Sequence, residues 1–93
     1  MSITRINEFR AQEGQGHALR TLIRSFVSLI ESSDGCQSCT VLQHQDDPTR
    51  IVVVEVWDSV EAHQAAAKNI PPRALEEAMT LLAGPPQGAY YHA

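Results

Sequence analysis

The stretch at residues 50–63, RIVVVEVWDSVEAH, decides the fold. Residues 51–57 are apolar at nearly every position, which is typical of a strand that is covered on both faces. Asp58, with Glu61 three residues later, then predicts the start of a helix. A chain of 93 residues offers helices for only one face of such a strand. We therefore expect a second subunit to cover the other face.

Apolar periodicity and turn residues predict the elements around this stretch. Residues 2–10 alternate and predict a strand, whereas the apolar positions of residues 17–33 have helical spacing. The remaining predicted elements are, in order, a weaker strand over residues 36–44, the strong strand over 50–57, two helical pieces separated by Pro71-Pro72, and a last strand over 88–93.

The order β-α-β-β-α-β is the split βαβ plan, and it predicts a single α+β, ferredoxin-like domain over residues 1–93. Right-handed crossovers place both helical segments on one face of a four-stranded antiparallel sheet, with the first and third strands in its centre. The opposite face carries half of the valines of the strong strand and has no cover within the chain. We therefore expect a homodimer in which two sheets pack face to face.

Composition and charge exclude several classes of protein. Hydrophobic residues make up 43% of the chain and charged residues 19%, which is typical of a globular domain. The net charge of −4 and the isolated positions of the basic residues argue against nucleic acid and anionic membranes as partners. The longest apolar run, residues 51–54, is far shorter than a membrane span. Two cysteines and the lack of a recognisable targeting segment favour a cytoplasmic protein.

Cys36 and Cys39 have the CxxC spacing of some redox and zinc sites. They lie in a predicted strand, however, where residues three apart point to opposite faces. A single CxxC without a second ligand pair is also a weak zinc signal. We therefore predict two structural cysteines and no metal site.

The element order, the Gly35-Cys36 start of the second strand and the sequence Glu55-Val56-Trp57-Asp58-Ser59 resemble the antibiotic biosynthesis monooxygenase superfamily of dimeric α/β barrels. The resemblance covers essentially the whole chain, and residues 82–86 are similar to the polyketide-tailoring members. It implies a monooxygenase that uses molecular oxygen, without metal or cofactor, on a quinol-like or polycyclic phenolic substrate.

The superfamily is functionally mixed, so the resemblance leaves other functions open. Its other members degrade haem, process signalling molecules or have no known activity. One alternative is a non-catalytic dimeric barrel that binds a small hydrophobic ligand or serves a stress response. A second alternative is an isomerase or a signal-molecule-processing enzyme on the same scaffold.

The sequence departs from two branches of that superfamily. A Trp and a His of the haem-degrading branch correspond to Ala66 and Glu76, so the resemblance does not imply haem ligation. In the polyketide-tailoring branch, an Asn four residues before the strand Trp corresponds to Val53. A Tyr six residues after that Trp corresponds to His63. Only Trp57 carries over from this set.

The two central strands are expected to project side chains into one cleft between the sheet and the helices, namely from Asn7, Phe9, Val53, Glu55 and Trp57. An aromatic wall, a carboxylate and an amide around an apolar pocket suit a flat aromatic substrate. We expect Trp57, Phe9 and Val53 to contact the substrate. The alternatives are core packing for Trp57 and, for Glu55, a structural carboxylate that pairs with an arginine or caps a backbone N–H.

His63 has the helical spacing of Val60 and Ala67, so it should face the same cleft. An imidazole titrates near neutrality, which makes His63 the expected general base, with Asn7 and Glu55 as further catalytic candidates. In the hypothesised reaction the base removes a phenolic proton and the resulting anion passes an electron to oxygen. A lone helical histidine that only tolerates its position is the alternative.

The connection at residues 68–73 is the expected lid of the cleft. Arg73 at its end is a candidate to bind an anionic group of the substrate, and a solvated helix-start residue is the alternative. One of Tyr90 and Tyr91 is expected to line the cleft, because neighbouring residues of a strand point to opposite faces.

Overall fold

The computed structural model describes residues 2–93, which contain four strands and four helices. In chain order they are β1 (Ile3–Arg10), α1 (Gly16–Arg24), α2 (Val27–Glu31), β2 (Cys36–Gln43), β3 (Arg50–Trp57), α3 (Val60–Ala67), α4 (Pro72–Leu81) and β4 (Gln87–Tyr91). The pairs α1–α2 and α3–α4 each form one crossover. The predicted split βαβ order is therefore confirmed.

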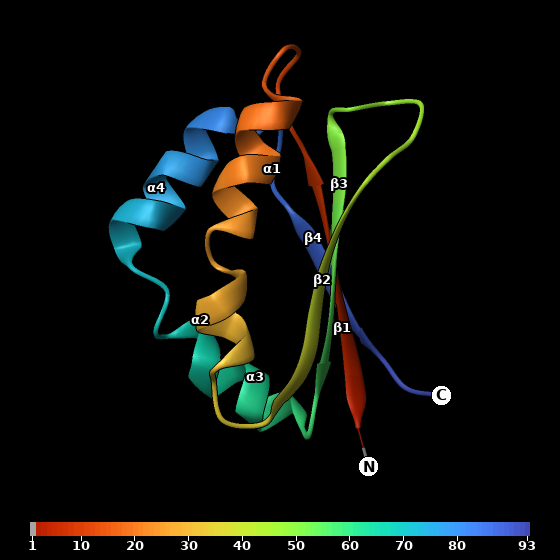
Figure 1. Cartoon of the computed structure of the whole chain (residues 1–93), viewed down its shortest axis with the longest axis vertical. Coiled ribbons are helices and arrows are strands. Elements are labelled where there is room, and N and C mark those ends of the chain that lie inside the picture. The colour runs from red at the N-terminus through yellow and green to blue at the C-terminus, as the bar shows by residue number, and fades with distance from the viewer. Residues whose placement is uncertain (1) are drawn as a thin grey trace.

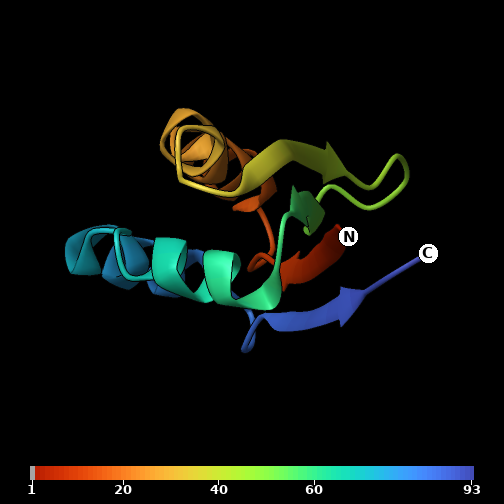
Figure 2. The same ribbon diagram turned by 90° about the horizontal axis from the view of Figure 1, so that it is seen from below.

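The strands form one antiparallel sheet in the order β2-β3-β1-β4, with β1 and β3 in the centre as predicted. All helices lie on one side of this sheet (Figure 1), and Figure 2 shows α1 and α2 in one row and α3 and α4 in another. The edges β2 and β4 do not meet. A single chain therefore has an open ferredoxin-like sheet, with one face covered by helices.

Burial alternates strictly along β3 and shows which way each side chain points. The odd-numbered residues from Ile51 to Trp57 are buried under the helices, and the valines between them are partly exposed on the open face. The strong strand is therefore apolar on both faces, as its sequence predicted, but the chain covers only one of them.

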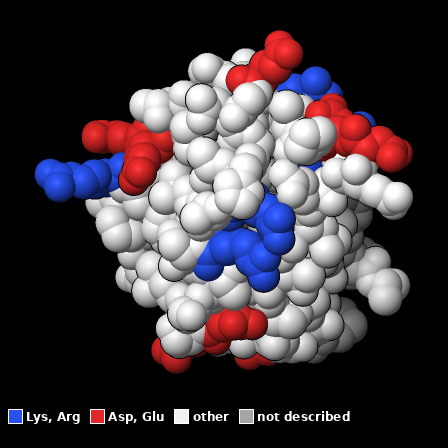
Figure 3. Space-filling model, turned by 45° about the horizontal axis from the view of Figure 1, so that its top comes forward, with Lys and Arg blue, Asp and Glu red and all other residues white. Residues whose placement is uncertain are grey.

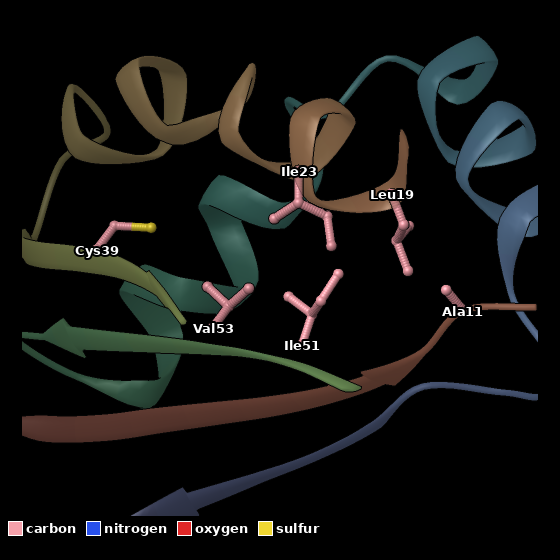
Figure 4. Packing of buried hydrophobic residues seen from close by; sticks show 6 residues of the cluster. All are labelled: Ala11, Leu19, Ile23, Cys39, Ile51 and Val53. Carbon is pink, nitrogen blue, oxygen red and sulfur yellow. The ribbon is translucent and has the colours of Figure 1, made fainter. Parts of the chain in front are cut away.

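The main apolar core lies between α1 and the sheet (Figure 4) and consists of Ala11, Leu19, Ile23, Cys39, Ile51 and Val53. Leu19 and Ile23 lie one helical turn apart, so both point from α1 toward β3. Leu19 and Ile51 are almost completely buried, with 0% and 1% of their surfaces exposed. This core fixes α1 on the sheet at the end where β3 begins.

The single helix predicted over residues 17–33 is divided into α1 and α2 at Ser25 and Phe26. The Ser25 hydroxyl donates a hydrogen bond to the carbonyl of Leu22, and the Phe26 amide donates to the carbonyl of Ile23. These short-range bonds compete with regular α-helical bonding, as a serine side chain can do inside a helix. The apolar periodicity continues across the break, which is why the sequence pattern did not reveal it.

α3 begins one residue later than the capping-box pattern predicted. Ser59 is the N-cap, and its hydroxyl accepts a hydrogen bond from the amide of Ala62 at 3.1 Å. Asp58, the predicted cap, instead accepts a hydrogen bond from the side-chain amide of Gln37 in β2 at 2.8 Å. Either residue type can cap a helix, so sequence alone did not distinguish them.

The prediction that Cys36 and Cys39 face opposite ways is wrong. The pairing of β2 with β3 shifts between Cys36 and Ser38, so Cys36 pairs with Trp57 and Cys39 with Glu55, two residues that face the helices. Such a bulge inserts one extra residue and reverses the alternation beyond it. Both thiols are free, and burial raises the pKa of Cys39 to about 12. A thiol with this pKa stays protonated at neutral pH.

No helix within residues 2–93 is both long and apolar enough to cross a membrane. On the face shown in Figure 3, basic and acidic side chains form small separate groups and not one continuous basic surface. This distribution agrees with the isolated basic residues of the sequence.

Candidate functional site

A cavity of about 70 Å³ lies between the sheet and α3, near the end of β3. Two strands, two helices and the connection after α3 supply its walls, through Asn7, Ile30, Glu55, Trp57, His63, Ala66, Ala67 and Ile70. The alanines of α3 carry short side chains, which leaves room between this helix and the sheet. The wall is mostly apolar and contains a few polar groups, as ligand sites commonly do.

Four of the seven predicted site residues meet at this cavity, namely Asn7, Glu55, Trp57 and His63. The other three lie elsewhere. Phe9 packs against the main core, Val53 is buried within that core, and Arg73 is exposed in the first turn of α4.

Trp57 and Glu55 form a buried hydrogen-bonded pair. The indole N–H of Trp57 donates to Oε1 of Glu55 at 2.8 Å, and the two residues are only 1% and 5% exposed. Burial raises the pKa of the Glu55 carboxyl, against the opposing effects of this hydrogen bond and of the nearby Arg5 guanidinium. The structural alternative paired Glu55 with an arginine or a backbone N–H, whereas its hydrogen-bond donor is the indole of Trp57 and Arg5 acts at a distance.

His63 points from α3 toward the sheet, as its helical spacing predicted. Its Nδ1 lies 2.6 Å from the Tyr90 hydroxyl oxygen, and its Nε2 lies 4.0 Å from Oε1 of Glu55. The imidazole also makes edge contacts with the rings of Trp57 and Tyr90, with centroids 5.5 and 5.4 Å away. These neighbours hold the ring in one orientation beside the cavity.

The surroundings of His63 disfavour the charged form of its imidazole. Burial lowers its pKa below the ordinary value of 6.5, and the positive charge of Arg5 lowers it further. The 4.0 Å contact with Glu55 is an ion pair only when the imidazole is protonated. A neutral imidazole has one nitrogen free to accept a proton, so His63 is ready to act as a base.

Arg5 and Tyr90 also belong to the site. Tyr90 was one of the two tyrosines expected to line the cleft, whereas Arg5 was not singled out from the sequence. The Arg5 guanidinium lies 4.7 Å from the centre of the Tyr90 ring, which is a cation–π contact. Arg5 pairs with both Glu55 and Tyr90 in the sheet register, so the three side chains share the helix-covered face. Arg5 could have been found from the alternation of β1, because it lies two residues before Asn7.

Because Gly88 has no side chain, the side chains of Arg5 and Asn7 can occupy the space above it. A Cβ atom at this position would collide with the Asn7 side-chain oxygen and the Arg5 guanidinium, so both side chains lie directly over the glycine backbone. Of the two tyrosines that follow, the pairing with Arg5 places Tyr90 on the helix-covered face. Tyr91 lies on the open face and is 52% exposed.

A larger hollow of about 340 Å³ lies at the other end of the sheet and includes Glu8, Arg10 and Arg50 in its wall. All three charged residues are exposed to solvent. No desolvated reactive group therefore faces this hollow. Within residues 2–93, no three His, Cys, Asp or Glu side chains gather closely enough to hold a metal ion.

Comparisons with known proteins agree with this fold. The family model described as "Antibiotic biosynthesis monooxygenase" matches residues 2–77. The chain belongs to the antibiotic biosynthesis monooxygenase family. A comparison with curated protein sequences gives no match.

Solved structures share the fold across nearly the whole chain. A Nitrosomonas europaea protein has a TM-score of 0.90 at 19% identity, with 99% of this chain and 89% of that chain covered. A Chloroflexus aurantiacus protein has a TM-score of 0.75 at 30% identity, with 100% and 95% covered. A variant of SnoaB from Streptomyces nogalater, a cofactor-independent oxygenase, has a TM-score of 0.82 at 17% identity, with 99% and 92% covered.

Proposed function

We propose that this protein is a cofactor-independent monooxygenase that acts on a small electron-rich phenol. The observation that carries the proposal is the imidazole of His63, held beside Glu55 and the indole of Trp57 in an apolar-walled cavity. Membership of the antibiotic biosynthesis monooxygenase family and the likeness to the fold of SnoaB support an oxygenase over other uses of such a base.

The proposed reaction begins with proton transfer from the phenol to His63. The resulting anion is electron-rich and gives one electron to oxygen, and the two radicals combine at the ring carbon para to the hydroxyl. The peroxide anion that forms takes the proton back from His63, and the resulting hydroperoxide loses water together with the ring hydrogen at that carbon, which becomes a carbonyl. Overall, the phenol and one oxygen molecule give a quinone and one water molecule, so no external reductant is needed.

The protein contributes a base, orientation and a desolvated cavity. Glu55 lies close enough to stabilise the imidazolium that His63 becomes after it accepts the proton. The buried indole of Trp57 offers an aromatic wall, and Asn7 offers an amide that can bind the substrate oxygen. Keeping water away from the anion increases these electrostatic effects.

The size of the cavity favours a substrate with one aromatic ring. Sites for drug-sized ligands have volumes of about 300–1,000 Å³, whereas this cavity has about 70 Å³. A one-ring phenol therefore fits better than a polycyclic one. A polycyclic substrate would require the connection that carries Ile70 to move away from the sheet.

The open face of the sheet supports a homodimer, which we include in the proposal. Its exposed side carries the partly exposed valines of β3 together with Leu42 and Tyr91, each 52% exposed. Two such faces packed together would cover these side chains and complete a barrel from two open sheets. Analytical ultracentrifugation should show a dimer that Val54→Asp dissociates. A wild-type monomer at micromolar concentration would contradict this part of the proposal.

Oxygen uptake tests the proposed reaction. Chelator-treated protein would be supplied with electron-rich phenols that carry a para hydrogen, from one-ring methoxyphenols to three-ring anthrones. We expect uptake above autoxidation, fastest with one-ring substrates, and one atom of isotopically heavy oxygen in the quinone product. Oxygen-independent conversion of a substrate would favour the isomerase alternative, and saturable binding without turnover would favour the ligand-binding alternative.

A further inference from the structure

We propose that the Arg5 guanidinium and the Asn7 side-chain amide form an anion subsite that binds the phenolate oxygen of the substrate. This inference rests on the proposed function, in which His63 takes the phenolic proton, and it names the groups that hold the anion left behind. Asn7 lines the cavity, and Arg5 lies beside Asn7 on the side of β4.

The Arg5 guanidinium has no counterion among residues 2–93. Glu55 is its partner in the sheet register, yet Oε1 of Glu55 accepts the indole N–H of Trp57 and makes its ion-pair contact with His63. The Nε of Arg5 is buried and finds no hydrogen-bond partner within the described part of the chain. Because a desolvated donor without a partner is unfavourable, this group is suited to receive an acceptor atom from a ligand.

The sheet holds this guanidinium next to the cavity and apart from the carboxylate. A Cβ atom at Gly88 would collide with both Arg5 and Asn7, so the two side chains meet over the same glycine. Gly88 lies on β4, opposite Asn7, whereas Glu55 lies on β3, on the other side of β1. The contact with the Tyr90 ring, whose centre is 4.7 Å away, helps to hold the guanidinium on the β4 side.

Proton transfer to His63 requires such a group. Burial and the charge of Arg5 keep the pKa of His63 below 6.5, whereas an unperturbed phenol has a pKa of about 10. The transfer is therefore unfavourable by a factor of more than about a thousand unless its products are stabilised. Glu55 can stabilise the imidazolium. A positive charge within about 4–6 Å favours the ionised form of an acid by about tenfold to a thousandfold, so Arg5 can stabilise the phenolate.

Binding of a nitrophenol tests the subsite without turnover. Its phenolate form absorbs visible light, and its ring is too electron-poor to give an electron to oxygen, so the ionisation of the bound molecule can be observed directly. In the wild-type protein we expect the phenolate to bind about tenfold to a thousandfold more tightly than the neutral nitrophenol.

Three substitutions separate the charge of Arg5 from its packing. Arg5→Met should remove the preference for the phenolate, and Arg5→Lys should keep part of it because it keeps the positive charge. Arg10→Met is the matched control, since Arg10 is an exposed arginine of the same strand on the open face of the sheet, and it should leave the preference unchanged.

Turnover provides the second readout. Arg5→Met should lower kcat for oxygen uptake by about tenfold or more with weakly acidic phenols. The loss should be smaller with more acidic phenols, because their anions need less stabilisation, whereas a merely structural role of Arg5 would give the same loss with every phenol.

Two results would overturn the anion subsite: a wild-type protein that does not prefer the phenolate, or a preference that survives in Arg5→Met. The fate of the proposed function is decided separately by His63→Gln. Loss of oxygen uptake in that variant would leave the proposed function standing without the subsite, and full oxygen uptake would remove the proposed function as well.

Discussion

The two halves of the helix-covered face of β3 differ sharply, although they belong to one strand. The first half presents Ile51 and Val53, which pack into the apolar core under α1. The second half presents Glu55 and Trp57, which meet His63 beside a cavity under α3. The alternation of side chains along β3 brings both halves to the same face of the sheet, so the strand itself does not explain why they differ. The difference follows from the helix that covers each half, which is α1 over the first and α3 over the second.

This difference separates the part of the molecule that stabilises the fold from the part that is suited to chemistry. Burying Glu55 is unfavourable for its charged form, as the raised pKa of its carboxyl shows. An apolar residue at this position would avoid that cost, but it would leave the buried indole N–H of Trp57 without its acceptor. A local violation of the apolar pattern is typical of a functional site.

The largest effect on stability is expected in the apolar half. Ile51→Ala should lower the free energy of unfolding by about 2–5 kcal/mol, because it opens a cavity at a side chain that is only 1% exposed. Urea denaturation would measure the change. Leu29→Ala, at a residue on α2 that is 39% exposed, should change stability by less than about 1 kcal/mol. Equal losses in the two variants would contradict the position of the core.

Trp57→Phe should affect both stability and function, because this residue belongs to the polar half and is also buried. Loss of the indole N–H leaves the buried Glu55 carboxyl without its donor, which costs about 1–3 kcal/mol. The pKa of Glu55 should rise further, since this hydrogen bond lowers it. Urea denaturation and oxygen uptake would be measured on the same preparation. A loss of stability with full turnover would make Trp57 a core residue only.

Ser59→Ala should destabilise the helix that carries His63. The substitution removes the side-chain oxygen that accepts the Ala62 amide, at a cost of about 1 kcal/mol. Asp58→Ala is the control, since Asp58 makes an exposed contact with Gln37 and does not cap the helix. Thermal unfolding of both variants would measure the costs. A larger loss of stability in Asp58→Ala than in Ser59→Ala would show that Asp58 is the cap.

The smallest expected effect is the pH dependence of stability due to His63. The folded-state pKa of His63 lies below its unfolded value of 6.5, so between these two values the unfolded chain binds more protons. This contribution to stability is complete above the unfolded pKa and is lost as pH falls through the folded pKa. Glu55, whose pKa is raised, acts in the opposite sense as pH rises above 4.5.

The difference between the wild-type protein and His63→Gln isolates the histidine contribution. Urea midpoints measured between about pH 7.5 and 5.5 should fall more steeply in the wild-type protein than in the variant. Parallel midpoints in the two proteins would mean that His63 titrates normally and that its imidazole is not desolvated.

The sequence was sufficient for most of the fold and for the centre of the site. Alternation in β1 and β3 and the helical spacing of His63 placed Asn7, Glu55, Trp57 and His63 together. These patterns follow directly from backbone geometry, so they needed no knowledge of how the elements pack.

Features that depend on pairing between distant elements could not be predicted from the sequence. The register of β4 against β1 decides that Tyr90, and not Tyr91, lies on the helix-covered face. The orientation of Cys36 follows from a β-bulge in β2 that no turn or glycine in its sequence indicates. Phe9 and Val53 were on the predicted face but at its apolar end. Alternation gives the face of a strand and not the helix that covers each part of it.

The most direct test compares oxygen uptake by the wild-type protein, His63→Gln and His17→Gln on the best phenol of the panel. His17 lies exposed on α1 and is the matched histidine control. If the polar half of β3 and His63 form the reaction site, uptake should fall by about a hundredfold or more in His63→Gln and stay unchanged in His17→Gln. Full activity of His63→Gln would show that the base lies elsewhere.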